Sequence, residues 1–515
     1  MPRDQEIELK LDVNRESLPR IKAHPLFGDG EVLTRSIPSV YFDTDDFELR
    51  DAGLSLRVRR TGGAYVQTIK SNTFGNPMLR GEWEQKINGP NPDLKAIRDK
   101  PLKRVLKKTD ATIKPIFETS VRRSMRQLNN AGSTIELALD IGEISAGDRS
   151  ETLCELELEL KNGSPKALFE LARNLSETVP MLVSVRSKAE RGYTILERQS
   201  PKSEKALAVP VLPSCSAGQA FQMIARVCIR QVLANRPGVL AGDAEAVHQM
   251  RIGLRRLRTA ISLFDELLAD DQRESIKQEL KWVTGELGPA RELDVLQSEV
   301  LDPLSTVIPR DAGRVEAKEE FELRRQRAHE AAAKAVDSRR FAATILSVAE
   351  WVEAGPWTSS RDPLMSARKK TPAKEHAAVE LARRRKKIRK QAREISELSP
   401  RQRHKLRIRA KKLRYASEFF KDVFPGKKNA RRRKSMISAL KELQTALGGL
   451  NDINSREHLM SDVPKRHPVS PRTSERRLSF AAGVMYGSQE AQVSDLMVLA
   501  KKAQATFQET KAFWN

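Results

Sequence analysis

The chain has 515 residues, of which 39% are hydrophobic and 31% are charged. A chain of this length usually divides into two or three domains, and its apolar fraction is sufficient for folded cores. The 3 cysteines have no CxxC spacing, which argues against a thiol-based zinc site and a disulfide framework. Two prolines and a glycine interrupt the uncharged run at 206–225, and no signal peptide is visible, so we expect a cytoplasmic protein without a membrane span.

The formal net charge of +24 is distributed unevenly along the chain. Residues 1–200 carry 32 Lys and Arg against 30 Asp and Glu, whereas residues 201–515 carry 60 against 38. Such an excess attracts polyanions, whether nucleic acid, anionic membranes or polyphosphate. Only 5% of the residues are aromatic, so the chain has few side chains on which the bases of a nucleic acid could stack. We therefore expect the second part to bind a polyanion without specific recognition of nucleic acid.

The first 200 residues show the alternation of apolar and polar residues that is typical of β-strands. Segments with this period of two lie at 6–11, 39–44, 54–60, 65–70, 82–87, 134–140 and 154–160. Residues 164–177 have helical spacing after a capping serine. Three prolines interrupt 199–214, and beyond this segment apolar residues recur at helical spacing. We predict a multidomain α+β protein with domains at 1–200 and 215–515, joined by a linker at 201–214, and we expect the first domain to fold on its own.

Each predicted strand has a charged face and a largely apolar face, because alternate residues project from the same side. Glu155, Glu157 and Glu159 form a ladder that repels itself unless cations lie opposite. A solvated surface is the simplest interpretation of any one strand. Several acidic and basic strands together favour a barrel with the charged faces inward, around water, a metal ion and a highly charged ligand. An oligophosphate suits such a lumen, because carboxylates bind Mg²⁺ or Mn²⁺ and basic side chains bind phosphate.

Eight segments, in order, resemble the CYTH domain of the triphosphate tunnel metalloenzymes. They are EIELK at 6–10, YFDT at 41–44, GLSLRVRR at 53–60, TIK at 68–70, RGEWE at 80–84, ELALDIGEI at 136–144, CELELEL at 154–160 and SKAERGY at 187–193. The resemblance implies an eight-stranded antiparallel β tunnel with flanking helices, dependence on Mg²⁺ or Mn²⁺, and hydrolysis of inorganic triphosphate. Thiamine triphosphate and ATP are alternative substrates, because the family also includes thiamine triphosphatases and adenylate cyclases.

The resemblance also implies roles for individual residues. The metal-binding carboxylates would be Glu6, Glu8, Asp140, Glu157 and Glu159. The catalytic residues would be Lys10 and Lys70, and the substrate-binding residues would be Arg57, Arg59, Arg123 and Lys188. Arg122 is adjacent to Arg123, and a slip of one residue would exchange which of the two faces the lumen.

The second part contains an internal duplication. HQMRIGLRRLR at 248–258 matches HKLRIRAKKLR at 404–414, and LGPARELDV at 287–295 matches LGGLNDINS at 447–455. On a helix, the His and basic residues of each copy fall on one stripe. We call these the first basic stripe (His248, Arg251, Arg255 and Arg258) and the second basic stripe (His404, Arg407, Lys411 and Arg414). A solvated helix face explains either stripe alone, whereas their repetition favours an anion groove.

These repeats resemble the CHAD domain over about residues 215–510. The resemblance implies an all-α pair of four-helix bundles with a basic channel that binds inorganic polyphosphate, and an association with polyphosphate granules. The predicted function is metal-dependent hydrolysis of inorganic triphosphate in the first part, beside polyphosphate binding in the second. A polyphosphate-binding protein without catalysis is the alternative from a different class.

Overall fold

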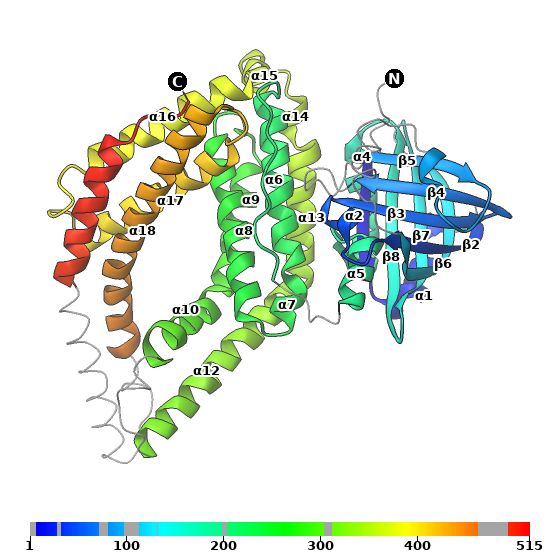
Figure 1. Cartoon of the computed structure of the whole chain (residues 1–515), viewed down its shortest axis with the longest axis horizontal. Coiled ribbons are helices and arrows are strands. Elements are labelled where there is room, and N and C mark those ends of the chain that lie inside the picture. The colour runs from blue at the N-terminus through cyan, green and yellow to red at the C-terminus, as the bar shows by residue number, and fades with distance from the viewer. Residues whose placement is uncertain are drawn as a thin grey trace.

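The computed structural model describes residues 7–27, 32–71, 81–96, 113–130, 132–197, 203–302, 312–461 and 493–514. A β-rich N-terminal region is followed by a helical region (Figure 1). Within the described residues the named strands end at Val183, and the helical region begins with α6 at Ala217. The mixed α+β prediction is therefore confirmed. No described helix combines the length and the hydropathy needed to cross a lipid bilayer.

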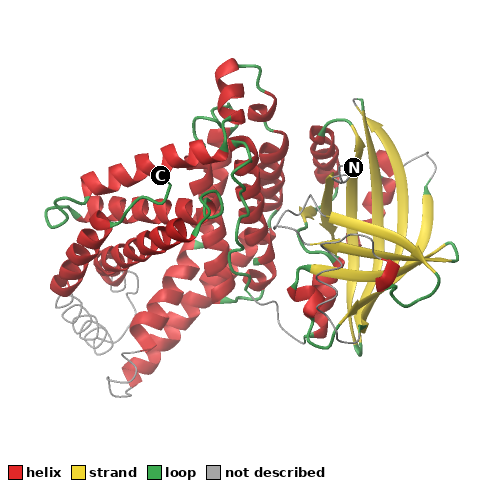
Figure 2. Cartoon of the chain, turned by 45° about the horizontal axis from the view of Figure 1, so that its top comes forward, coloured by secondary structure: helices red, strands yellow, loops and turns green. Residues whose placement is uncertain are grey.

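Among the described residues, nine antiparallel strands form one sheet in the order β5-β4-β3-β2-β6-β7-β8-β1-β9. The sheet is strongly curved (Figure 2). The strands are β1 (Ile7–Val13), β2 (Leu33–Asp43), β3 (Leu54–Thr61), β4 (Ala64–Ser71), β5 (Gly81–Ile87), β6 (Lys114–Asn130), β7 (Ser133–Ala146), β8 (Arg149–Asn162) and β9 (Met181–Val183). The resemblance implied eight strands, which is corrected to nine in the described part of the chain. The segments predicted from alternation include neither β6 nor the 3-residue β9. Within the described residues β5 and β9 are the two unpaired edges, so the sheet is not closed, and the expectation of a closed barrel is corrected to an open curved sheet.

Helices cover the apolar side of the sheet. The helix α4 (Pro165–Thr178) begins at Ser164, whose side chain accepts a hydrogen bond from the Lys166 amide, close to the predicted start. Its buried residues, Phe169 among them, pack in one cluster with Leu9 and Leu158 of the sheet. By contrast, α5 (Lys188–Leu196) packs on β6, β7 and β8 from the other, charged side of the sheet, where Ala189 and Tyr193 join a separate apolar cluster with Phe117. Two short helices, α1 (Leu18–Ala23) and α2 (Glu48–Asp51), complete the region.

The helical region carries the predicted duplication on long helices. The first basic stripe lies on α8 (Ala244–Leu263), and the second lies on α17 (Pro400–Phe419). The other helices are α6 (Ala217–Ala234), α7 (Arg236–Leu240), α9 (Arg273–Glu286), α10 (Gly288–Leu296), α12 (Ala312–Asp337), α13 (Arg339–Ala354), α14 (Pro356–Ser359), α15 (Pro363–Lys370), α16 (Ala373–Gln391) and α18 (Lys427–Ser461). Residues 493–509 are also helical. On α8 the apolar residues Met250, Leu254 and Ile261 are all buried, so they form an apolar stripe that faces the core.

One continuous apolar cluster joins the two regions. It runs from Leu9 and Leu168 in the N-terminal region to Phe221 and Trp351 in the helical region. The helix α13 packs on α4 and β9 across this boundary. Part of the predicted linker belongs to the same cluster, because Val209 is 1% exposed and its neighbour Val211 is fully buried. Independent folding of residues 1–200 stays a prediction, and such a fragment would lose this shared apolar contact.

Candidate functional site

Charged side chains gather on the sheet face opposite the apolar cluster. Because β7, β8 and β1 are neighbours, their pairing aligns carboxylates across strands. Glu8 lies directly opposite Glu159, and Glu159 lies opposite Glu136 on the next strand. We call Glu8, Glu136 and Glu159 the acidic row. Glu6 lies outside the described residues.

A second group, which we call the mixed cluster, lies beside the acidic row and contains both signs of charge. Its members are Lys10, Arg123, Asp140, Glu155, Glu157 and Lys188. Lys10 Nζ lies 2.8 Å from Glu157 Oε1 and 3.3 Å from Glu155 Oε1. Lys188 Nζ lies 2.8 Å from Asp140 Oδ2, 3.2 Å from Glu157 Oε1, and also contacts Glu155. One carboxylate oxygen from each of Asp140, Glu155 and Glu157 lies within 4.8 Å of the others.

Opposite charges keep Glu157 and Lys188 of the mixed cluster ionised despite their burial. Burial alone would raise the pKa of Glu157, but Lys10, Lys188 and Arg123 hold that pKa well below its usual range. Burial alone would lower the pKa of Lys188, but its carboxylate neighbours, Glu155 foremost, raise it. The three carboxylates of the mixed cluster therefore lie against three cations, but the buried Oε2 of Glu155 accepts no hydrogen bond from any described residue, and the spacing of the three carboxylates would also allow a metal ion.

In the acidic row, the ion pairs of the described residues involve fewer cations than carboxylates. Lys161 Nζ lies 2.6 Å from Glu159 Oε1 and 3.7 Å from Glu136 Oε1, and Lys10 Nζ lies 3.7 Å from Glu8 Oε1. That Glu8 oxygen is buried and accepts no hydrogen bond from the part of the chain that the structure describes. Because like charges on adjacent strands repel, a row of carboxylates with an unsatisfied oxygen fits a divalent cation with oxygen ligands, such as Mg²⁺ or Mn²⁺.

The predicted basic residues of β3 and β4 also have charged surroundings. Arg57 Nη2 lies 3.4 Å from Glu82 Oε1, and Lys70 Nζ lies 2.8 Å from Glu82 Oε2. Burial, together with the neighbouring Arg57 and Arg123, lowers the pKa of Arg59 to about 10. Arg59 Nε is buried and donates no hydrogen bond to any described residue. A guanidinium that is short of anionic partners is suited to bind an anion.

The structure settles one alternative that the sequence left open. Arg123 contacts Asp140 and Glu157, whereas Arg122 is exposed on the other side of β6. Glu136, Glu155 and Glu82 had no assigned role. The period of two along 134–140 and 154–160 puts Glu136 and Glu155 on the charged faces of their strands. The pairing of β7 with β8 then brings Glu136 beside Glu159 and Glu155 beside Asp140. The functional roles of all these residues stay predictions.

The first basic stripe holds closely spaced cations on α8. Arg251 Nη1 donates a hydrogen bond of 2.8 Å to the Thr284 carbonyl oxygen. Burial lowers the pKa of His248, and Arg291 and Arg255 lower it further. Burial also lowers the pKa of Arg251, with a further effect from Arg255. A bound anion would relieve this mutual repulsion.

The two repeats share one local contact. A Cβ atom added at Gly288 would lie 3.4 Å from Arg251 Nη1, and one added at Gly448 would lie 3.2 Å from Arg407 Nη2. Both glycines belong to the duplicated LG segments, so each repeat packs its stripe arginine against the equivalent glycine. The last stripe position differs, because Arg414 pairs with Glu418 at 2.8 Å.

Comparison with known proteins agrees with both regions. A model of the CYTH domain matches residues 4–193, and a model of the CHAD domain matches residues 223–461. The chain contains a CYTH domain followed by a CHAD domain. The CHAD domain from the plant Ricinus communis has a similar fold, with a TM-score of 0.51 and 24% identity, covering 60% of this chain and 98% of that one.

Two curated relatives match different shares of the chain. The inorganic triphosphatase of Haemophilus influenzae is 29% identical over 204 residues, which cover 38% of this chain and 56% of that protein. The chain therefore spans little more than half the length of this relative. An uncharacterized protein of Mycobacterium tuberculosis is 25% identical over 487 residues, which cover 90% of this chain and 88% of that protein.

Proposed function

We propose that the CYTH domain hydrolyses inorganic triphosphate to pyrophosphate and orthophosphate in a metal-dependent reaction. The observation that carries this proposal is the acidic row, with its unsatisfied Glu8 oxygen, on the same sheet as Arg59, whose buried Nε lacks a hydrogen-bond acceptor among the described residues. Triphosphate is a small, highly charged anion that needs both a divalent cation and several basic side chains for neutralisation. The similarity to an inorganic triphosphatase supports this substrate. In this proposal the curved sheet forms the wall of a tunnel around the substrate.

In this proposal, different carboxylates of the domain have different roles. Glu8, Glu136 and Glu159, together with Glu6, would hold Mg²⁺ or Mn²⁺, which would neutralise charge on the phosphate oxygens. Asp140 and Glu157 were predicted as metal ligands. Their contacts with Lys10, Arg123 and Lys188 support a different role, in which these carboxylates hold the phosphate-binding cations in place.

Positioning and charge neutralisation supply most of the catalysis in phosphoryl transfer. Lys10, Arg123 and Lys188 would hold one part of the substrate, and Arg57, Arg59 and Lys70 would hold the rest. Water then attacks the terminal phosphorus atom, the bond to the bridging oxygen breaks, and pyrophosphate leaves.

A substrate and metal screen tests this proposal. The purified chain is incubated with triphosphate, pyrophosphate, ATP or thiamine triphosphate, each with Mg²⁺, with Mn²⁺ or with a chelator, and released orthophosphate is measured. We expect the fastest release from triphosphate with metal, and none with the chelator. Faster release from ATP or thiamine triphosphate would assign an organic substrate. No release from any of the four would favour the non-catalytic alternative.

We propose that the CHAD domain binds inorganic polyphosphate along the two basic stripes. Burial is the main cause of the depressed pKa values of His248 and Arg251, and the further lowering by neighbouring arginines supports this proposal because it shows cations close together. The uneven charge of the chain supports it as well, since the excess of Lys and Arg lies beyond residue 200. An association with polyphosphate granules would follow from such binding.

A further inference from the structure

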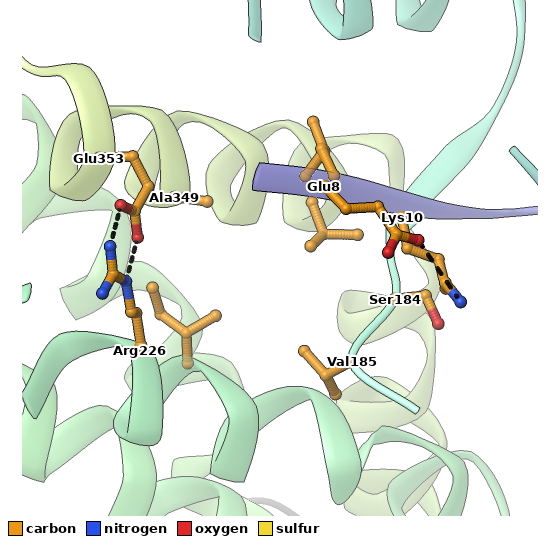
Figure 3. A pocket seen from close by; sticks show the side chains of 10 residues that line it. Glu8, Lys10, Ser184, Val185, Arg226, Ala349 and Glu353 are labelled. Carbon is orange, nitrogen blue, oxygen red and sulfur yellow. Dashed lines mark hydrogen bonds and ion pairs between the residues drawn. The ribbon is translucent and has the colours of Figure 1, made fainter. Parts of the chain in front are cut away.

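The CHAD domain borders the strand that carries Glu8 and Lys10. A small pocket lies between the two domains, lined by Glu8 and Lys10 on β1, Arg226 on α6 and Glu353 on α13 (Figure 3). Arg226 Nε donates a hydrogen bond of 2.6 Å to Glu353, so this pair is satisfied within the CHAD domain. The helix α6 therefore lies beside the strand that carries Glu8 and Lys10, while its Arg226 is paired within the CHAD domain.

Arg230 lies one helical turn beyond Arg226 and reaches into the CYTH domain. Its Nη1 donates a hydrogen bond of 2.8 Å to the Val185 carbonyl oxygen, and its Nη2 donates to Glu190 Oε1. Glu204 follows the CYTH domain in sequence, and its Oε2 lies 3.7 Å from Arg230 Nη2. The Arg230 side chain is 12% exposed, so these contacts are shielded from water. Charge-assisted bonds of this kind are stronger than those between neutral groups.

The partners of Arg230 fix the start of α5. Glu190 Oε2 accepts a hydrogen bond of 2.7 Å from the Ser187 amide, and Ser187 Oγ accepts one of 3.1 Å from the Glu190 amide. This capping box holds the first turn of the helix. Lys188 is the first residue of α5, and its ammonium group contacts Asp140, Glu155 and Glu157 in the mixed cluster. Arg230 thus binds one carboxylate oxygen of Glu190. The other oxygen of Glu190 accepts the hydrogen bond that holds the first turn of α5, which carries Lys188.

We propose that Arg230 of the CHAD domain is a positioning residue for Lys188, so that the CHAD domain completes the phosphate-binding site of the CYTH domain. This inference rests on the proposed function of the CYTH domain. Without Arg230, the Glu190 carboxylate and the Val185 carbonyl oxygen each lose the hydrogen bond that Arg230 donates. The turn between them then gains freedom, and Lys188 holds substrate less well.

A matched pair of variants separates this role from a general effect on stability. Arg230→Met removes the contacts across the domains. Arg236→Met removes a pair of the same kind within the CHAD domain, where Arg236 Nε donates to the Val336 carbonyl oxygen at 3.0 Å and Nη2 contacts Asp337. In the full chain with Mg²⁺, we expect Arg230→Met to raise KM for triphosphate about tenfold and to change kcat less than about twofold. Arg236→Met should leave both constants unchanged, and Arg230→Lys should recover part of the loss.

Amide hydrogen exchange gives a readout that does not depend on activity. We expect exchange in residues 188–196 to be faster in Arg230→Met than in the unmodified chain, and unchanged in Arg236→Met. Equal KM values, equal exchange, or the same change in both variants would overturn the inference. If the unmodified chain does not hydrolyse triphosphate, the proposed function fails, and exchange in α5 alone decides whether Arg230 positions this helix.

Discussion

Arg123 on β6 donates two hydrogen bonds of 2.7 Å to Asp140, the residue directly opposite on β7. Its neighbour Arg122 is exposed. The pairing leaves the Asp140 carboxylate buried but ionised, because Lys188 and Arg123 lower its pKa against the opposing effect of burial. Two adjacent residues of the same type therefore have opposite environments, which provides a matched experiment.

Replacing Arg123 should impair both stability and catalysis, whereas replacing Arg122 should affect neither strongly. Arg123→Met leaves buried carboxylates with fewer cations, which costs about 3 kcal/mol in the free energy of unfolding. It also removes a phosphate-binding group, so we expect kcat/KM for triphosphate to fall by roughly a hundredfold or more. Urea denaturation and steady-state kinetics measure the two effects. Similar losses in Arg122→Met and Arg123→Met would contradict the assignment of Arg123 to the site.

Polyphosphate affinity should depend on pH through His248. Burial, with nearby arginines, holds the pKa of His248 below its ordinary value in the free protein. A bound polyanion raises that pKa, so binding takes up a proton. Affinity should therefore increase as the pH falls through the pKa of the bound state, and should level off below the depressed pKa of the free state.

Dissociation constants measured from about pH 8 to about pH 5 test this dependence on histidine ionisation. His248→Gln should flatten the profile. His404→Gln, which replaces the exposed histidine of the second basic stripe, serves for comparison. The idea would have to be abandoned if His248→Gln kept the full dependence on pH.

The two basic stripes should bind polyphosphate more strongly than an equal charge elsewhere. Replacing Arg251, Arg255, Arg407 and Lys411 by Ala should abolish binding at physiological salt. A control variant removes the same charge from exposed positions on α16, with Lys374, Lys386, Lys387 and Lys390 replaced by Ala. It should weaken binding only modestly, because screened surface charges contribute little. Equal losses in the two variants, or displacement of polyphosphate by duplex DNA at equal phosphate concentration, would indicate general attraction to a basic surface.

The sequence determined which faces of the strands are charged more reliably than which residues meet. Alternation in 6–11 and 154–160 predicted the carboxylate faces of β1 and β8, because a period of two requires no knowledge of the partner strand. The position opposite Glu8 depends on register, which the pairing of β1 with β8 supplies. Arg122 and Arg123 could not be distinguished for the same reason. The strand β9 was missed because 3 residues are too few to show a period.

Contacts between the domains lay beyond any local pattern. Proline content at 199–214 suggested a linker, but burial of Val209 and Val211 depends on distant residues of the shared apolar cluster. Arg230 is an ordinary arginine of an amphipathic helix in sequence. Its bond to Glu190, 40 positions earlier, arises only when the two domains pack together.

The triphosphatase activity of a single carboxylate variant, compared with its matched control, tests metal-dependent hydrolysis at the acidic row most directly. Glu8→Gln keeps the shape of the side chain but removes charge from the acidic row. Glu143→Gln makes the same change at an exposed position on the opposite face of β7. With saturating Mg²⁺ and triphosphate, we predict that Glu8→Gln lowers kcat by roughly a hundredfold or more while Tm changes little, and that Glu143→Gln behaves as the unmodified chain. Unchanged turnover in Glu8→Gln would contradict a metal-dependent reaction at the acidic row.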